Sequence, residues 1–113
     1  VQRTMTSVNN TGPTGAIVNS YDDFLQEELR DPELAAAYLT AALEGSQQEF
    51  LLALRSVADA HGGLGAVAEA TQLNRQTLYR TLSGQGNPTL ATLQGVLHAV
   101  GLTLAFAPAA SAP

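Results

Sequence analysis

The sequence predicts an all-α protein, a five-to-six-helix bundle that contains a helix-turn-helix. Two observations point to this fold class. Apolar residues make up 45 % of the 113 residues, but aromatic residues only 5 %, and Trp is absent. A core built from Leu, Val and Ala favours packed helices over a sandwich or barrel, which needs more β-branched and aromatic residues. In addition, helix start and stop signals recur between Ser20 and Gly101.

The length is that of one domain, to which we assign residues 20–107. Residues 1–19 are polar and lack periodicity, which predicts a flexible N-terminal tail, and residues 108–113 read as a disordered end. No apolar stretch approaches the about 18–20 residues of a membrane span, so we expect a soluble cytoplasmic protein that does not contact a membrane. The absence of Cys excludes disulfides and thiolate metal sites.

Two helices are predicted before residue 46 from their end signals. Ser20 can cap a helix over residues 21–30, whose first turn is acidic. Asp31 as N-cap, with Pro32 at the first helical position, starts a second helix that ends at Gly45. Four residues form its predicted inner face: Leu34, Tyr38, Ala41 and Ala42.

A third helix is predicted to start at a capping box, in which Ser46 is the N-cap and Glu49 lies three residues later. Gly62-Gly63 would end it. Its apolar residues follow helical spacing: Phe50, Leu54, Val57, Ala58 and His61.

The next segment has the pattern of a helix-turn-helix. It divides into a short helix over 65–70, a tight turn over 71–73, and a second helix over 75–82 that Asn74 caps. The predicted inward residues are Val67, Ala68, Leu73, Leu78 and Leu82. The predicted outward residues of the second helix are Arg75, Gln76, Thr77, Tyr79 and Arg80. These outward side chains would face a DNA major groove if the second helix is a recognition helix.

A final helix is predicted from the cap Thr89 to Gly101, and an alternating run over 102–106 follows it. Two interpretations of this run stay open. It could be a short C-terminal strand that pairs with its twin in a dimer, or a coil whose Leu104 and Phe106 cover the core.

Charge is unevenly distributed along the chain. Ten acids against five arginines give a net charge of −5, which by itself argues against a nucleic-acid binder. Residues 20–61, however, hold nine acids and two arginines, a net −7, whereas residues 1–19 and 62–113 each sum to +1. Such asymmetry between two halves suggests two different partners.

The run VAEATQLNRQTLYRTLSGQGNPTLATLQGVLHAVGL resembles the helix-turn-helix of phage-repressor-like (XRE-type) regulators. More closely, the chain from Tyr21 to Phe106, roughly three quarters of it, resembles the HigA-type antidote proteins of addiction modules. The shared features are DPELAAAYLTAALE, FLLALRSVADAHGG, LNRQTLYRTLSGQGNP and GLTLAF. Gln72 stands where the family has a turn glycine. A side chain at a position that prefers φ > 0 costs about 1 kcal/mol.

The resemblance implies an antitoxin of a type II toxin–antitoxin module. Such proteins bind a small basic toxin of the RelE/ParE type, and they dimerise on their own operator DNA as autorepressors. The −7 segment suits a cationic partner, and a homodimer would double the few DNA contacts of one protomer. The DNA-binding candidates are Asn74, Arg75, Gln76, Thr77, Tyr79 and Arg80. The toxin-binding candidates are Tyr21, Asp22, Asp23, Glu27 and Glu28. We favour a packing role over a partner contact for the neighbouring apolar residues Tyr21, Phe24, Leu25, Tyr38 and Leu39.

Two alternatives stay open: a stand-alone prophage-type repressor without a toxin, and a protein-interaction module that has lost DNA binding. The sequence offers little for catalysis, because it has no Cys, GxSxG, P-loop or HExxH pattern. His61 and His98 have no partner at metal-ligand spacing. We therefore predict no enzymatic activity, no cofactor and no metal.

Overall fold

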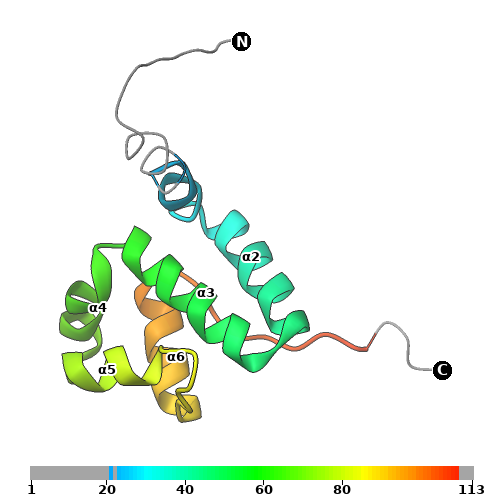
Figure 1. Ribbon diagram of the computed structural model, residues 1–113. Coiled ribbons are helices and arrows are strands. Elements are labelled where there is room, and N and C mark those ends of the chain that lie inside the picture. Colours follow the sequence, from blue (N-terminus) through cyan, green and yellow to red (C-terminus); the bar gives the residue numbers. More distant parts are fainter. Residues whose placement is uncertain (1–20, 22, 110–113) are drawn as a thin grey trace, which may run out of the picture.

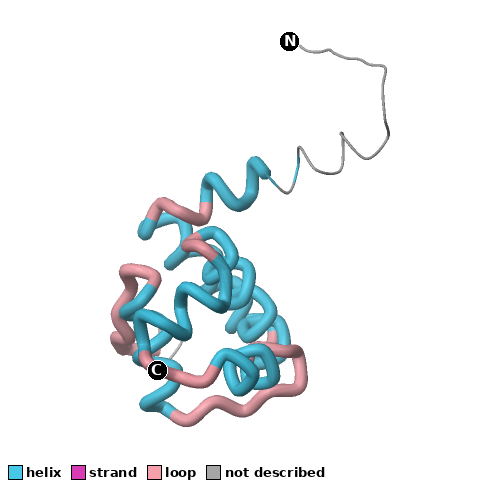
Figure 2. The backbone as a smooth tube through the Cα atoms, turned by 90° about the vertical axis from the view of Figure 1, so that its left-hand side faces the viewer, coloured by secondary structure: helices cyan, strands magenta, loops and turns pink. Residues whose placement is uncertain are grey.

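The computed structural model describes residues 21 and 23–109, and every regular element in this part of the chain is a helix (Figure 1). Residues 23–28 are helical and precede five longer elements. These are α2 (Pro32–Gly45), α3 (Gln47–Ala60), α4 (Gly63–Thr71), α5 (Arg75–Thr81) and α6 (Leu90–Ala99). Figure 2 shows helices joined by loops, with no strand among the described residues. The prediction of an all-α helical bundle is confirmed.

Side-chain caps start four of these helices at the predicted residues. Each cap oxygen accepts a hydrogen bond from a backbone N–H in the first turn, at 2.9–3.1 Å. The cap residues are Asp31 for α2, Ser46 for α3, Asn74 for α5 and Thr89 for α6. These bonds satisfy donors that have no partner inside the helix.

The capping box at the start of α3 forms only in part. The Ser46 hydroxyl accepts from the Glu49 N–H at 3.0 Å. The Ser46 N–H, which a full box would pair with the Glu49 carboxylate, instead donates to the Ala42 carbonyl at 3.1 Å. The reason is that Ser46 is at once the C-cap of α2 and the N-cap of α3. The chain therefore passes from α2 to α3 through a single residue, Ser46.

The core contains Leu, Val and Ala, as the composition predicts. Helix α2 packs on α3, α3 on α4, and α4 on both α5 and α6. Of the predicted inward residues, Val67, Ala68, Leu78 and Leu82 are buried, and Leu73 is half-buried against the core. The largest side chains with almost no exposure are Leu29, Leu51, Leu54, Leu64, Leu78 and Leu82.

The predicted inner face of α2 is wrong by one position. Ala35 and Leu39 are the buried residues, whereas Leu34 is 42 % exposed and Ala41 is exposed. Tyr38 and Ala42 are half-buried. Apolar residues surround most of this helix, so its periodicity does not define one face, and packing on α3 selects the stripe that is buried.

The N-terminal end of the described chain is held by burial of Leu29 in the core and by one hydrogen bond to α3. The Leu29 side chain is 2 % exposed, and Arg30 Nε donates to the Ala60 carbonyl at 3.4 Å. A cation at the C-terminal end of a helix is also favoured by the helix dipole. The first helix ends at residue 28 rather than at 30, because residues 29–30 form a turn. Its predicted cap, Ser20, and the predicted tail 1–19 lie outside the described residues.

The segment between α3 and α4 also differs from the prediction. Gly62 adopts φ 102° as the predicted terminator, but Gly63 already belongs to α4, which therefore starts two residues early. His61 is the C-cap of α3. None of the described helices has the length and hydropathy that a membrane span requires.

After α6 the chain continues without helix or strand through residue 109 (Figure 1). Leu102 and Leu104 are half-buried against the core. Phe106 is 93 % exposed, so the expectation that it covers the core is wrong. Pairing of this segment with a second copy is an intermolecular contact and stays a prediction. The predicted disordered end 108–113 lies partly outside the described residues.

Candidate functional site

Helices α4 and α5 are joined by three residues, Gln72–Asn74, which is the turn length of a helix-turn-helix. Gln72 has φ 60° and ψ 26°, in the left-handed region. This confirms that a side chain stands at a position that favours glycine. The Leu73 N–H donates to the Ala68 carbonyl at 3.1 Å, and Thr71 Oγ1 donates to the Val67 carbonyl at 2.8 Å. These bonds hold the turn in spite of the unfavourable φ at Gln72.

Helix α5 has one buried and one exposed face. Leu78 is fully buried and lies against α4 and the core. The structure places all six predicted DNA-binding residues at the exposed surface of this segment: Asn74, Arg75, Gln76, Thr77, Tyr79 and Arg80. Asn74 also serves as the helix cap, since its Oδ1 accepts from the Thr77 N–H at 3.0 Å. The predicted orientation of α5 is therefore confirmed. Contact of this face with DNA stays a prediction.

Two arginines from different helices lie against the ring of Tyr79. The Cζ atom of Arg75 is 5.6 Å from the ring centroid, and Arg75 Nη2 donates to the Tyr79 hydroxyl at 3.5 Å. The Cζ atom of Arg55, on α3, is 5.1 Å from the same centroid. Both distances lie within the range of a cation–π contact. Arg55, Arg75 and Tyr79, together with Arg80, are called the arginine cluster below.

Sequence reasoning missed Arg55, because it lies in the acidic segment 20–61 and 24 residues before Tyr79. By contrast, Arg75 and Tyr79 are four residues apart on α5, a spacing that places two side chains on the same face. No local pattern indicates the contact between Arg55 and Tyr79. It exists because α4 and α5 fold back beside α3.

The loop after α5 is fixed by a close backbone approach at Gly86. Its N–H donates to the Ser83 carbonyl at 3.1 Å. A Cβ atom at position 86 would overlap the backbone carbonyl of Thr81, the last residue of α5. The second glycine of the LSGQGNP run is therefore required by space, and it returns the chain from α5 toward α6.

A second exposed surface lies on the first helix, residues 23–28. Of the predicted toxin-binding residues, Tyr21, Asp23 and Glu27 are exposed and Glu28 is half-buried; Asp22 lies outside the described residues. Phe24 is 60 % exposed and Tyr21 is 67 % exposed. The exposed residues Tyr21, Asp23, Phe24 and Glu27 are called the acidic aromatic surface below.

The exposure of Tyr21 and Phe24 contradicts the packing role that we favoured for them. Leu39 is buried and Leu25 is half-buried against the core, as expected. Within the helix over 23–28, Leu25, Gln26 and Glu28 are half-buried, whereas Asp23, Phe24 and Glu27 are exposed to solvent. Figure 1 shows this helix well separated from α5.

The chain resembles known proteins along most of its described length. A family model described as "Probable addiction module antidote protein" matches residues 18–108. An uncharacterized protein of Haemophilus influenzae is 36 % identical over 77 residues, which cover 67 % of this chain and 78 % of the relative. No solved structure is significantly similar to the chain. The chain therefore belongs to the family of probable addiction module antidote proteins.

Proposed function

We propose that this protein is the antitoxin of a type II module, that it neutralises a RelE/ParE-like toxin, and that it represses its own operon by binding operator DNA as a dimer. The observation that supports the proposal most is the arrangement of two surfaces with opposite charge, the arginine cluster on α3 and α5 and the acidic aromatic surface at the first helix. Such surfaces suit two different partners, one anionic and one cationic.

For the anionic partner, α5 serves as an HigA-type (XRE-like) recognition helix that enters the major groove. Gln76 can form a bidentate contact with adenine, and Arg75 or Arg80 with guanine or a phosphate. Arg55 reaches the same surface from α3 and contributes a phosphate contact. Tyr79 positions the two arginines on its ring.

Dimerisation follows from the small number of cations. One protomer brings Arg55, Arg75 and Arg80 to DNA, and the whole chain has only five arginines and a net charge of −5. Phosphate neutralisation supplies much of DNA affinity, so three cations bind weakly. Two copies on half-sites about 34–36 Å apart would double the contacts.

For the cationic partner, the acidic aromatic surface supplies both steering and burial. Asp23 and Glu27 attract a basic toxin, which raises the rate of encounter. Phe24 and Tyr21 offer large apolar side chains that a partner can cover, and aromatic residues often carry much of the binding free energy of an interface. Neighbouring residues of one surface therefore serve the two steps.

The toxin half of the proposal is tested by rescue of growth. The small basic protein encoded beside this gene is induced in a host with and without the antitoxin. We expect growth arrest that co-expression relieves, and co-purification of the two proteins. A neighbour that causes no arrest, or an arrest that this protein fails to relieve, would favour the stand-alone repressor.

The DNA half is tested by the salt dependence of binding to the upstream region. Arg55→Gln removes one cation from the arginine cluster, and we expect the slope of log K against log salt to fall by about 0.9 for each lost phosphate contact. Arg30→Gln is the matched control. Arg30 lies in the turn before α2, and its side chain donates to the Ala60 carbonyl at the C-terminal end of α3. Equal slopes for the two variants would show that Arg55 does not contact a DNA phosphate. Absence of sequence-specific binding by the wild type would favour the protein-interaction module.

A further inference from the structure

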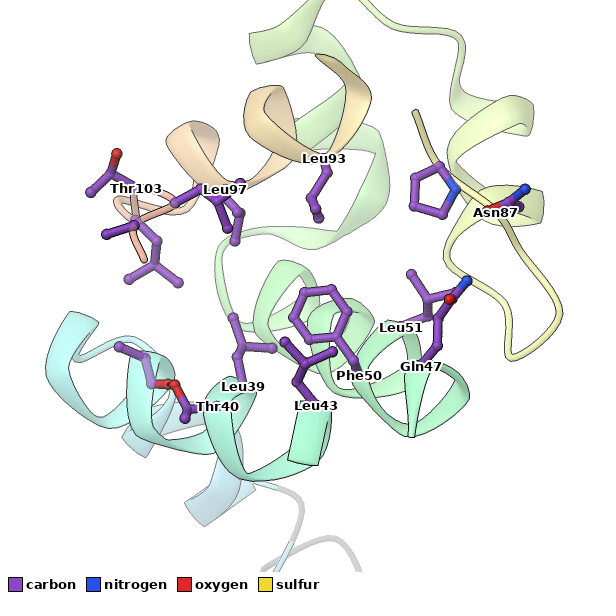
Figure 3. Close-up of a pocket in the computed structure, with 15 residues that line it drawn as sticks. Leu39, Thr40, Leu43, Gln47, Phe50, Leu51, Asn87, Leu93, Leu97 and Thr103 are labelled. Atoms are coloured by element: carbon purple, nitrogen blue, oxygen red, sulfur yellow. The ribbon is translucent and has the colours of Figure 1, made fainter. Parts of the chain in front are cut away.

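An open apolar groove of about 410 Å³ lies between the first half of the bundle and its C-terminal part. Figure 3 shows Leu39 and Leu43 of α2 and Phe50 of α3 facing Leu93 and Leu97 of α6 across it. Residues 102–105 line the same groove. Leu43 is 56 % exposed, and Phe50 and Leu93 are only half-buried. One chain thus leaves apolar walls at this place without filling the space between them.

Directly after the residues that line the groove, the chain exposes an apolar side chain to solvent. In the segment after α6, Leu102 and Leu104 are half-buried against the core. Phe106, the next residue in this alternation, is 93 % exposed. Figure 1 shows the segment leaving the bundle beyond the end of α2. An open apolar groove and an exposed phenyl ring therefore lie next to each other on one surface.

We propose that this surface is the homodimer interface, in which Phe106 of each copy occupies the groove of the other. The inference rests on the dimer of the proposed function and names the surface that forms it. In a dimer with a two-fold axis, the same surface of each copy forms the interface. This surface contains both parts that the contact needs, an exposed phenyl ring and an apolar groove. The phenyl ring is apolar, as are the walls formed by Leu39, Leu43, Phe50, Leu93 and Leu97.

The area that this exchange buries is adequate for a dimer of moderate affinity. A buried aromatic side chain contributes about 150–250 Å², so two rings contribute about 300–500 Å². The walls that the rings cover lose a similar area. The flanking residues 105 and 107–109, all exposed in one chain, add to this sum. The total then approaches the about 1,200 Å² at the lower end of stable interfaces.

The first test measures the dimer dissociation constant of the full chain by sedimentation, without DNA or toxin. We expect Phe106→Ala to weaken the dimer by about 30-fold or more, as loss of a central aromatic residue does in other interfaces. Leu43→Glu, which places a charge on an exposed wall of the groove, should weaken it to a similar extent. Phe24→Ala removes another exposed ring, on the first helix, and should leave the dimer unchanged.

Mixing the two defective variants separates an exchange from a general loss of dimerisation. In a mixed dimer, the Leu43→Glu copy still has its Phe106 and the Phe106→Ala copy still has its groove. One of the two junctions is then intact, so the mixture should dimerise more strongly than either variant alone. A mixture that dimerises as weakly as each variant alone would overturn the proposed exchange.

Cross-linking gives a direct geometric readout, because the chain contains no Cys. Leu43→Cys and Phe106→Cys are made in separate chains, mixed and oxidised mildly. We expect a disulfide-linked pair, because Phe106 of the Leu43→Cys copy still occupies the groove of the Phe106→Cys copy. This intact junction holds the two cysteines beside each other at the second junction. Leu43→Cys mixed with Phe24→Cys should give no such pair.

The outcomes separate the inference from the proposed function. A wild-type dimer that Phe106→Ala and Leu43→Glu leave intact would overturn the inference and keep the dimeric repressor. A monomer at all concentrations would overturn both the interface and the proposed dimer. Loss of toxin co-purification by Leu43→Glu, with an unchanged dimer, would assign the groove to the toxin and overturn the inference.

Discussion

The two charged surfaces of this protein both display aromatic residues, but they hold them differently. In the arginine cluster, Tyr79 is 39 % exposed and two guanidinium groups from α3 and α5 lie against its ring. On the acidic aromatic surface, Phe24 and Tyr21 are 60 % and 67 % exposed near the N-terminal end of the described chain. The first surface is organised by contacts within the chain, whereas the second leaves its apolar area for a partner to cover.

This difference implies different ways of binding. A surface whose side chains are already positioned loses little conformational freedom on binding, which favours recognition of a rigid partner such as DNA. A surface with exposed rings gains free energy mainly from burial when a partner covers them. If the two surfaces act independently, substitutions in one should leave the function of the other unchanged.

The largest effect is expected from removing both outward arginines of α5. Arg75→Ala with Arg80→Ala should weaken operator binding by about 100-fold or more, since one bidentate contact contributes about 1–3 kcal/mol and each is lost twice in a dimer. Fluorescence anisotropy with labelled upstream DNA measures the affinity. The toxin affinity should stay the same. Unchanged operator affinity in a folded variant would show that α5 is not the recognition helix.

A smaller effect is expected from Phe24→Ala. Loss of an aromatic contact at the centre of an interface costs about 2 kcal/mol or more, which corresponds to about 30-fold in toxin affinity. Calorimetric titration of the purified toxin measures it, and operator binding by the same variant is the control. A toxin affinity within about two-fold of wild type would contradict the role of Phe24 in the interface.

The acids beside Phe24 should act on rate more than on affinity. Asp23→Asn with Glu27→Gln should slow association with a basic toxin by about three- to ten-fold at low salt and leave dissociation nearly unchanged. The difference should vanish as salt rises, because exposed charges are screened. Stopped-flow mixing at several salt concentrations tests this. A change confined to dissociation would indicate direct, buried ion pairs instead.

The smallest effect is expected at the turn between α4 and α5. A residue with a Cβ atom incurs about 1–2 kcal/mol in the left-handed conformation, and Gln72→Gly relieves this strain. About 0.4–1 kcal/mol of the gain is offset, because glycine makes the unfolded chain more flexible. We expect a net gain of about 0.5–1 kcal/mol in the free energy of unfolding, measured by denaturant melts.

Gln72→Ala is the matched control, because it keeps a Cβ atom at φ 60° and should leave stability within about 0.5 kcal/mol of wild type. Equal stability of the glycine and alanine variants would show that the turn stores no strain. Toxin affinity should be unaffected by either variant, since the turn joins α4 and α5, and Figure 1 shows the first helix well separated from α5.

Features that depend on neighbours in the sequence were predictable. The caps Asp31, Ser46, Asn74 and Thr89 start helices at their own positions, because a cap acts within one turn of the chain. The left-handed conformation of Gln72 was expected only from the resemblance, because the family has a glycine at this position. The outward face of α5 follows from its own periodicity, since Leu78 and Leu82 are the apolar residues at helical spacing.

Features that depend on contacts between distant segments came only from the tertiary structure. Packing against α3 decided which stripe of the apolar helix α2 is buried, and the return of α5 beside α3 brought Arg55 to Tyr79. Phe24 on the first helix and Phe106 in the C-terminal segment are exposed, because no other described segment covers them. The physical reason is the same in each case: local propensity determines where a helix begins and which side chains share a face, whereas burial depends on which other segments lie against that face.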